Sequence, residues 1–260
     1  MERDPTQKVG ATQALFSNFL SSENLDFSLQ QVVSVPVPGR PDKPLLVHPS
    51  AVVKRRPGTF EGRLAQFHAF AHIEFNAINL ALDAVYRFAG MPHEYYRDWL
   101  QVAAEEAHHF TLICEYLNHR DTHYGDYTAH DNLWQMALQT EHDVLLRMAL
   151  VPRVLEARGL DVTPKIVARL KSLGDTDAVR ILNTIYEDEI GHVEIGNRWY
   201  MYACDQRELE PIQTFKKILK EHARGYLSGP FNHDARAEAG FSETELRLLN
   251  ELSAEIKTAS

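Results

Sequence analysis

The sequence has little cysteine, no long hydrophobic run and no excess of positive charge. Its two cysteines, Cys114 and Cys204, show no Cys-x-x-Cys spacing, which excludes a zinc ribbon or a disulfide framework and favours a reducing compartment. No run of about eighteen apolar residues is present, which excludes a transmembrane helix. The N-terminus also lacks the charged and then apolar pattern of a signal peptide. We therefore expect a cytoplasmic protein.

The length and the net charge of the chain narrow the class of protein further. The chain has 260 residues, of which 44% are hydrophobic and 24% charged, which is typical of a globular protein with one sizeable core. The net charge of −9 disfavours binding to nucleic acid or to an anionic membrane, and the local basic cluster Lys54-Arg55-Arg56 is short. No internal repeat is visible apart from the pair of motifs described next.

Two copies of one short acidic and histidine motif stand out. The first is Glu105-Glu106-Ala107-His108-His109, and the second is Asp188-Glu189-Ile190-Gly191-His192. In each copy a His follows a Glu by three positions, so both side chains share one face of a helix and can reach one metal ion. One such motif alone is usually a solvated helix face. Two copies favour a metal pair, because helix bundles that hold two irons or manganeses use two Glu-x-x-His motifs and one Glu from each of two other helices.

A further carboxylate ligand is expected on the helix before the first motif. Glu74 is the one Glu inside an apolar run from Leu64 to Leu82, where a buried acid needs a partner. It lies 32 residues before Glu106, and the midpoint at Gly90-Met91-Pro92 combines a helix stop with a helix start. A hairpin that turns there places Glu74 level with Glu106.

A last carboxylate ligand is expected before the second motif. Glu156 lies in an apolar helix 33 residues before Glu189, so the first spacing is nearly repeated. Gly159 and Pro164 lie between Glu156 and the expected turn near Gly174, so the symmetry of the second hairpin with the first is less exact. The alternatives to Glu156 are Glu141 and Asp143.

The complete pattern resembles the ferritin-like di-iron carboxylate superfamily. It is closer still to a bacterial ferritin-like family catalogued as a domain of unknown function. The resemblance implies an all-α fold, a ferritin-like four-helix bundle with a long crossover, in one domain with an arm at 1–60, a metal-binding core at 61–204 and C-terminal helices at 205–260. It supplies no substrate. The match extends from about residue 40 to 245 and is carried by Arg40-Pro41, Gly62-Arg63, Ala71-His72-Ile73-Glu74, 105–110, 151–164, 188–199 and 229–236.

In this arrangement two metal ions need bridging carboxylates, terminal carboxylates and one imidazole each. Without metal, several buried carboxylates would lie close together, and some would have to be protonated. We expect two iron ions, or alternatively manganese or a mixed iron and manganese pair. The expected ligands are Glu106 and Glu189 as bridges, Glu74 and Glu156 as terminal carboxylates, and His109 and His192.

Other residues are expected to orient these ligands. We predict that Asp188 accepts a hydrogen bond from His109 and that Glu105 accepts one from His192, since a fixed acceptor orients a ligating ring. Solvent exposure of Glu105 is the alternative. His72 and His142 are expected beside the ligands or bonded elsewhere, in preference to being ligands themselves. His108 has a weaker claim than His109, and Gly191 either leaves room beside the metals or lets two helices pack closely.

The remaining segments are expected to surround the core. Residues 6–20 predict an outer helix, and dense prolines between Val35 and Pro57 predict an extended arm held to the surface by Val35, Val37, Leu45, Leu46 and Val47. Pro152 predicts a kink four residues before Glu156. The other expected elements are helices at 61–89 and 92–119, a crossover at 120–139, a third core helix to about 158, a short helix from Thr163-Pro164, helices at 175–204 and 211–227, and a last short helix after a capping box at 242–245.

The leading functional hypothesis is an oxidoreductase in which two ferrous ions activate dioxygen and oxidise an organic substrate. A small molecule is expected as substrate, and a nucleoside is conceivable because the superfamily includes a tRNA-modifying hydroxylase. The alternatives are a ferroxidase, peroxidase or iron-handling protein, and a non-catalytic bundle stabilised by metal. The expected partners are dioxygen or peroxide, a small-molecule substrate and an electron donor; no membrane is expected, nucleic acid is disfavoured, and a homodimer is left open.

Overall fold

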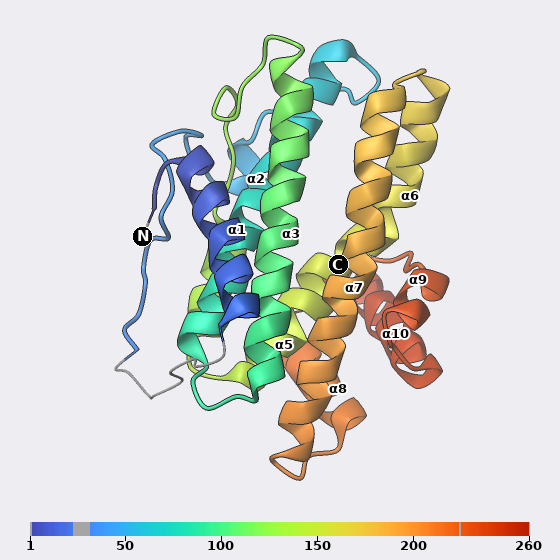
Figure 1. Ribbon diagram of the computed structural model, residues 1–260. Helices are drawn as coiled ribbons and strands as arrows, with labels where there is room; N and C mark the ends of the chain where they lie inside the picture. Colours follow the sequence, from blue (N-terminus) through green and yellow to red (C-terminus); the bar gives the residue numbers. More distant parts are fainter. Residues whose placement is uncertain (1, 23–31, 224, 260) are drawn as a thin grey trace. The chain divides into compact units, whose positions relative to one another are not determined.

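The computed structural model describes residues 2–22, 32–223 and 225–259. The chain falls into two compact units, Met1–Gln139 and Thr140–Ser260. All regular elements of the described residues are helical, apart from one isolated β-bridge between Leu46 and Ala129 (Figure 1), which confirms the all-α class. Each unit contains one long helical hairpin that packs with its own flanking helices.

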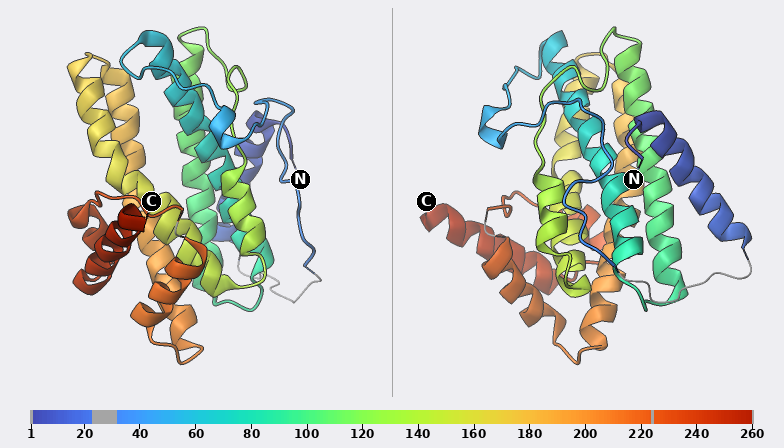
Figure 2. Two further views of the ribbon diagram at one scale, coloured as in Figure 1. Left: turned by 180° about the vertical axis from the view of Figure 1, so that it is seen from behind. Right: turned by 90° about the vertical axis from the view of Figure 1, so that its left-hand side faces the viewer.

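A helical hairpin forms the centre of the N-terminal unit. Thr59 caps its first helix by accepting a hydrogen bond from the Gly62 amide at 3.0 Å. The turn contains Gly90 with a φ of +78° and Pro92 just before the second helix, as the sequence predicts. Figures 1 and 2 show the two helices side by side, with the first helix of the chain against the second helix of the hairpin. The elements are α1 (Pro5–Ser21), the 3-10 turn η1 (Pro49–Ala51), α2 (Phe60–Arg87), α3 (His93–Asn118) and α4 (Asn132–Gln139).

Aromatic side chains fill the space between α2 and α3. Phe67 stacks on Tyr116 with ring centroids 4.1 Å apart, and Phe75 meets Phe110 at 5.4 Å. All four residues are buried. Burying these rings stabilises the hairpin and holds the two helices in a fixed register.

Backbone hydrogen bonds help to hold the proline-rich arm; of the five apolar residues expected to anchor it, Val35, Leu46 and Val47 are half-buried, whereas two are exposed. The Val47 amide donates to the Ala129 carbonyl at 2.9 Å, and the Ala129 amide donates to the Leu45 carbonyl at 3.1 Å. The side chain of Leu45 is 65% exposed and that of Val37 is 58% exposed. Dense prolines remove amide donors, so the amides that remain find partners on a neighbouring segment.

The C-terminal unit contains a second long hairpin, whose first arm is irregular. A π-helical segment, η2 (Val151–Glu156), joins two α-helices at the position of the expected kink. Pro152 packs directly on Gly196 of the opposite arm, where a Cβ added to the glycine would lie 2.3 Å from the Pro152 Cβ. The elements are α5 (Val144–Leu150), η2, α6 (Ala157–Ser172), α7 (Thr176–Asp205), α8 (Pro211–His222), α9 (His233–Glu238) and α10 (Glu243–Ala259).

The expected break before Thr163-Pro164 is wrong, because α6 continues through Gly159 and Pro164. Proline has no amide hydrogen, so it leaves the carbonyl four residues earlier without its helical donor. That carbonyl belongs to Leu160, and it accepts a hydrogen bond from the Asn232 side chain at 3.1 Å. A partner far along the chain thus permits the helix to continue.

The last helices agree with the sequence in position and differ in length. The capping box is confirmed, since the Glu245 amide donates to the Ser242 hydroxyl at 3.3 Å and the Ser242 amide donates to the Glu245 carboxylate at 2.9 Å. The helix that follows has 17 residues and is not short. Helix α8 ends at His222, before the expected end at Leu227.

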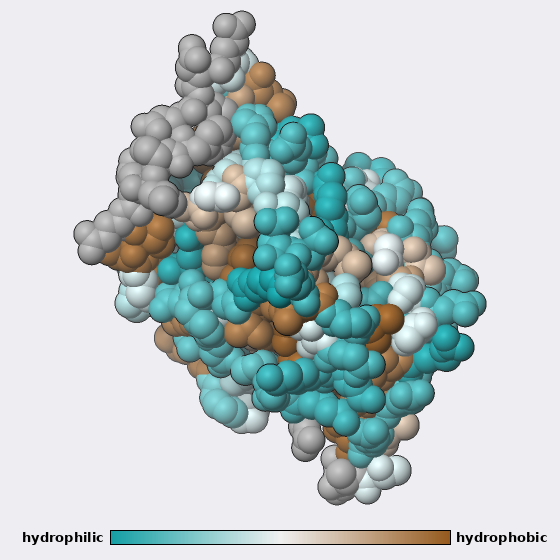
Figure 3. All heavy atoms as spheres, turned by 90° about the horizontal axis from the view of Figure 1, so that it is seen from below, coloured by the Kyte–Doolittle hydropathy of each residue, from teal (hydrophilic) through white to brown (hydrophobic). Residues whose placement is uncertain are grey.

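The surface is mixed in polarity. Seen from below (Figure 3), hydrophilic side chains cover much of the face and hydrophobic ones lie scattered between them. Within the described part of the chain, no helix combines the length and the apolar character that crossing a bilayer requires.

Candidate metal centre

Three of the expected ligands meet inside the N-terminal unit. Glu74 on α2 is 5% exposed, and Glu106 and His109 on α3 are fully buried. Each offers a ligand atom, and these atoms lie within 4.8 Å of one another. His109 Nδ1 is 3.4 Å from a Glu106 oxygen and 3.6 Å from a Glu74 oxygen. The i, i+3 spacing on α3 and the turn at Gly90 bring the three side chains together.

The electrostatics of this cluster favour a cation. Burial, together with the neighbouring Glu106 carboxylate, raises the pKa of the Glu74 carboxyl well above its usual range, while His109 acts in the opposite direction. Two carboxyl groups this close and this deeply buried cannot both ionise cheaply without positive charge beside them. A divalent cation would supply that charge.

The C-terminal unit carries the second motif in a looser arrangement. On α7, His192 Nδ1 lies 3.9 Å from a Glu189 oxygen, and the His192 side chain is 1% exposed while that of Glu189 is 13% exposed. Glu156 is half-buried as the last residue of η2. Among the described residues of 140–260, no three acidic, His or Cys side chains bring ligand atoms within 4.8 Å of one another.

The residues expected to orient the ligands have various environments. Glu105 is half-buried and accepts a hydrogen bond from Gln101 one turn earlier, at 3.0 Å. Asp188 is also half-buried. The predicted bonds of Glu105 to His192 and of Asp188 to His109 join residues of different units and stay predictions. His108 is exposed, in contrast to its buried neighbour His109.

His72 is bonded to the link between α3 and α4, and His142 is exposed. The His72 ring bonds through Nδ1 to the Tyr124 hydroxyl at 2.9 Å and through Nε2 to the His130 carbonyl at 3.1 Å. His72 therefore fastens the link between α3 and α4 to α2. His142 is exposed just before α5, which does not support a place beside a buried ligand.

His68 has a role that the sequence reasoning missed. It is 1% exposed, and its Nε2 accepts a hydrogen bond from the Gly125 amide at 2.8 Å. The signal in the sequence was the i, i+4 spacing of His68 and His72 on an apolar helix, which places both rings on one face. The two histidines together hold the link between α3 and α4.

This contact makes stability depend on pH. Burial, assisted by His72, lowers the pKa of the His68 imidazole from its usual 6.5 to about 4. Below pH 6.5 the unfolded chain takes up a proton that the folded chain does not, so the free energy of unfolding falls from there to about pH 4.

A His68→Gln variant keeps an acceptor for Gly125 but cannot titrate. We expect urea unfolding to show a shallower loss of stability between pH 6.5 and 4 for this variant, with little difference at pH 8; parallel pH curves would refute the assignment.

Fold and site together describe an all-helical protein with a buried Glu and His cluster able to hold a metal ion. Over residues 1–247 the chain matches the family described as "Protein of unknown function (DUF455)", and it belongs to that family. It is 43% identical over 266 residues to an "Uncharacterized protein" of Haemophilus influenzae, covering 98% of this chain and 92% of that protein. No solved structure shows significant similarity.

Proposed function

We propose that the protein is a ferritin-like four-helix bundle that binds two metal ions and uses them in oxidation chemistry. The first hairpin contributes Glu74, Glu106 and His109, and the second contributes the three remaining ligands, Glu156, Glu189 and His192. The observation that carries the proposal is the cluster of two buried carboxyl groups and one buried imidazole within 4.8 Å. The repeated motif and the similar spacings of 32 and 33 residues support the contribution of the second hairpin.

The donor set suits the metals proposed. Carboxylate oxygens and imidazole nitrogens bind iron and manganese, whereas a site built for softer ions would use thiolates. The buried carboxyl groups are costly to ionise without a cation, so metal binding also stabilises this part of the fold. Iron is the metal proposed first, with manganese or a mixed pair as the alternative.

A bound pair of ferrous ions would supply the electrons with which dioxygen is activated. The protein's own residues hold and bury the site. Glu74, Glu106 and His109 would hold the metal from two helices, and all three side chains are buried. The proposed substrate is a small organic molecule, with a nucleoside as one class to test.

The test compares adjacent histidines on α3. Metal-free protein is titrated with Fe(II) without oxygen, and bound metal per chain is measured by mass spectrometry. We expect two ions per chain for the wild type and for His108→Ala, which changes an exposed side chain, and fewer than two for His109→Ala. On α7, Glu189→Gln should also lose metal, whereas Glu194→Gln at an exposed position should not. No binding by the wild type, or full binding by His109→Ala, would overturn the proposal.

The redox part of the proposal has its own measurement. Oxygen is added to the Fe(II)-loaded protein in a closed cell, and dioxygen consumption is followed with an electrode. Rapid consumption that is lost in His109→Ala would support oxidation chemistry. Metal binding without consumption above that of free Fe(II) would leave a metal-stabilised bundle.

A further inference from the structure

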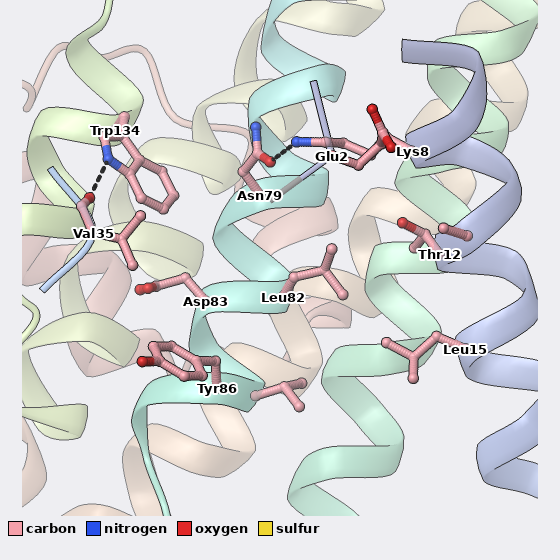
Figure 4. Close-up of a pocket in the computed structure, with 12 residues that line it drawn as sticks. Glu2, Lys8, Thr12, Leu15, Val35, Asn79, Leu82, Asp83, Tyr86 and Trp134 are labelled. Atoms are coloured by element: carbon pink, nitrogen blue, oxygen red, sulfur yellow. Dashed lines mark hydrogen bonds between the residues drawn. The ribbon is translucent and has the colours of Figure 1, made fainter. Parts of the chain in front are cut away.

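The cavity between α1 and α2 in the N-terminal unit has a volume of about 600 Å³ and side chains of both charges in its lining (Figure 4). The ammonium of the buried Lys8 donates to the Gly39 carbonyl and to the Asn79 side-chain oxygen. The carboxyl groups of Glu2 and Asp83 belong to the same lining. The cavity therefore has no net positive charge that would select an anionic ligand. Buried charges in the C-terminal unit are arranged differently.

A buried ion pair holds the residues that follow the proposed ligand Glu156. Arg236 of α9 is 2% exposed, and it donates to the Asp161 carboxylate of α6 through Nε at 2.9 Å and through Nη2 at 2.8 Å. Its Nη2 also donates to the carbonyl of Ala157, the residue after Glu156, at 3.2 Å. The Asn232 amide donates to the same carboxylate at 2.9 Å. These bonds fix the start of α6 to α9.

A second buried ion pair holds the residues that precede Glu156. Arg153 of η2 is 1% exposed, and its guanidinium pairs with the Glu245 carboxylate of α10. That carboxylate is itself held in place, because the Ser242 amide donates to it at 2.9 Å and the Ser242 hydroxyl at 2.8 Å. The end of η2 is therefore fixed to α10, just as the start of α6 is fixed to α9.

Glu156 lies at the junction of two helical geometries. It is the last residue of the π-helical segment η2, and regular α-helix begins at Ala157. A π-turn contains about one residue more than an α-turn and occurs mostly as a single turn within an α-helix. If η2 returned to α-helical geometry, the residues on its two sides would rotate relative to each other by about 100°, the angle between consecutive helical residues. The direction of the Glu156 side chain thus depends on the geometry of η2.

The bonded residues and Glu156 occupy different faces of this segment. Arg153, Ala157 and Asp161 follow one another at intervals of four residues, so they lie on one face. Glu156 lies about 100° around the helix from Ala157. The C-terminal helices therefore hold the segment from a face that Glu156 does not occupy.

We propose that Arg153 and Arg236 are positioning residues that keep η2 in its π-helical geometry and thereby orient Glu156 for metal binding. Arg153 fixes the rotation of the segment before Glu156, and Arg236 fixes it after Glu156. Hydrogen bonds within the segment cannot fix the rotation alone, because Pro152 has no amide hydrogen to donate. The inference rests on the proposed function, in which Glu156 is a metal ligand.

The test measures Fe(II) binding to the full chain by equilibrium dialysis without oxygen, at a temperature at which every variant is folded. We expect two ions per chain for the wild type. In Arg236→Met the second ion should bind at least about tenfold more weakly, the usual effect of removing a residue that orients a metal ligand. The matched control is Leu170→Ala, which removes a side chain 1% exposed about 20 Å along α6 from Glu156. It should lower the thermal midpoint and leave both iron affinities unchanged.

A double-mutant cycle shows whether Arg236 acts through Glu156. Glu156→Gln alone should weaken the second ion. Adding Arg236→Met to it should weaken that ion no further, because the ligand to be oriented is already lost. A further loss of the same size as in the single variant would show that Arg236 does not act through Glu156.

Unchanged affinity for the second ion in Arg236→Met, or an equal loss in Leu170→Ala, would overturn this inference and leave the metal centre in place. Absence of a second ion in the wild type would instead remove the proposed function, and the inference with it. If Arg236→Met does not fold, Asn232→Ala replaces it, since it removes a neutral bond from α9 to the Leu160 carbonyl of α6. That variant should also weaken the second ion, and an unchanged affinity would decide against the proposal.

Discussion

Replacing Arg153 by methionine is expected to lower the free energy of unfolding by about 3–5 kcal/mol, because the change leaves a buried carboxylate without its partner. Arg153 lies in η2 and is 1% exposed. Its guanidinium forms an ion pair with Glu245 of α10. Three rings surround it, with centroids at 4.0 Å for Tyr200, 3.9 Å for Phe215 and 5.0 Å for Phe241. Methionine can fill part of this space but cannot neutralise Glu245.

The control is the same substitution at an exposed ion pair of the same unit. Arg207 binds Asp143 at 2.7 Å and its side chain is 40% exposed, so Arg207→Met should cost no more than about 1 kcal/mol. Urea unfolding followed by circular dichroism measures both. Adding Glu245→Gln to Arg153→Met should recover part of the loss, because the buried charge is then gone. Equal losses for the two methionine variants would show that burial does not strengthen the Arg153 pair.

Replacing Gly196 by alanine is expected to destabilise the protein by about 1–3 kcal/mol, the usual cost of overpacking. The added Cβ would lie 2.3 Å from the Pro152 Cβ and 2.4 Å from its Cγ. A proline ring cannot rotate away, so the backbone of η2 or α7 must shift. This cost opposes the gain of up to about 1 kcal/mol that alanine brings to a helix interior.

Gly191 provides the matched control on the same helix. A Cβ added there meets no described atom within 4 Å, which favours open space over close helix packing as the reason for this glycine. Gly191→Ala should therefore leave the thermal midpoint unchanged or raise it, while Gly196→Ala lowers it. Similar midpoints for the two variants would contradict the contact with Pro152.

Local sequence patterns were sufficient to predict several parts of the fold. The hairpin of α2 and α3 follows from two apolar helices and a Gly-Met-Pro turn, and the capping box at Ser242 follows from four residues. Glu74, Glu106 and His109 were predicted to meet because one helical spacing and one short turn determine their positions. Short-range geometry of this kind can be read without knowing the rest of the chain.

Other parts depend on partners far away in the sequence. The continuation of α6 through Pro164 depends on Asn232, and the burial of Arg153 depends on Glu245 and three rings from other segments. The link between α3 and α4 is held by His68, whose partner Gly125 lies in the loop itself. No local pattern encodes which distant side chain satisfies a freed carbonyl or a buried charge.

The sequence by itself determined that the protein is all-helical and that one hairpin brings two acids and a histidine together, because helical periodicity and a tight turn act over short distances. Only the tertiary structure decided how the irregular segment around Pro152 is accommodated, which histidines hold the long link, and where a cavity with a buried lysine forms. These features arise from burial and packing between segments far apart in the chain, where many alternatives are compatible with the same local pattern.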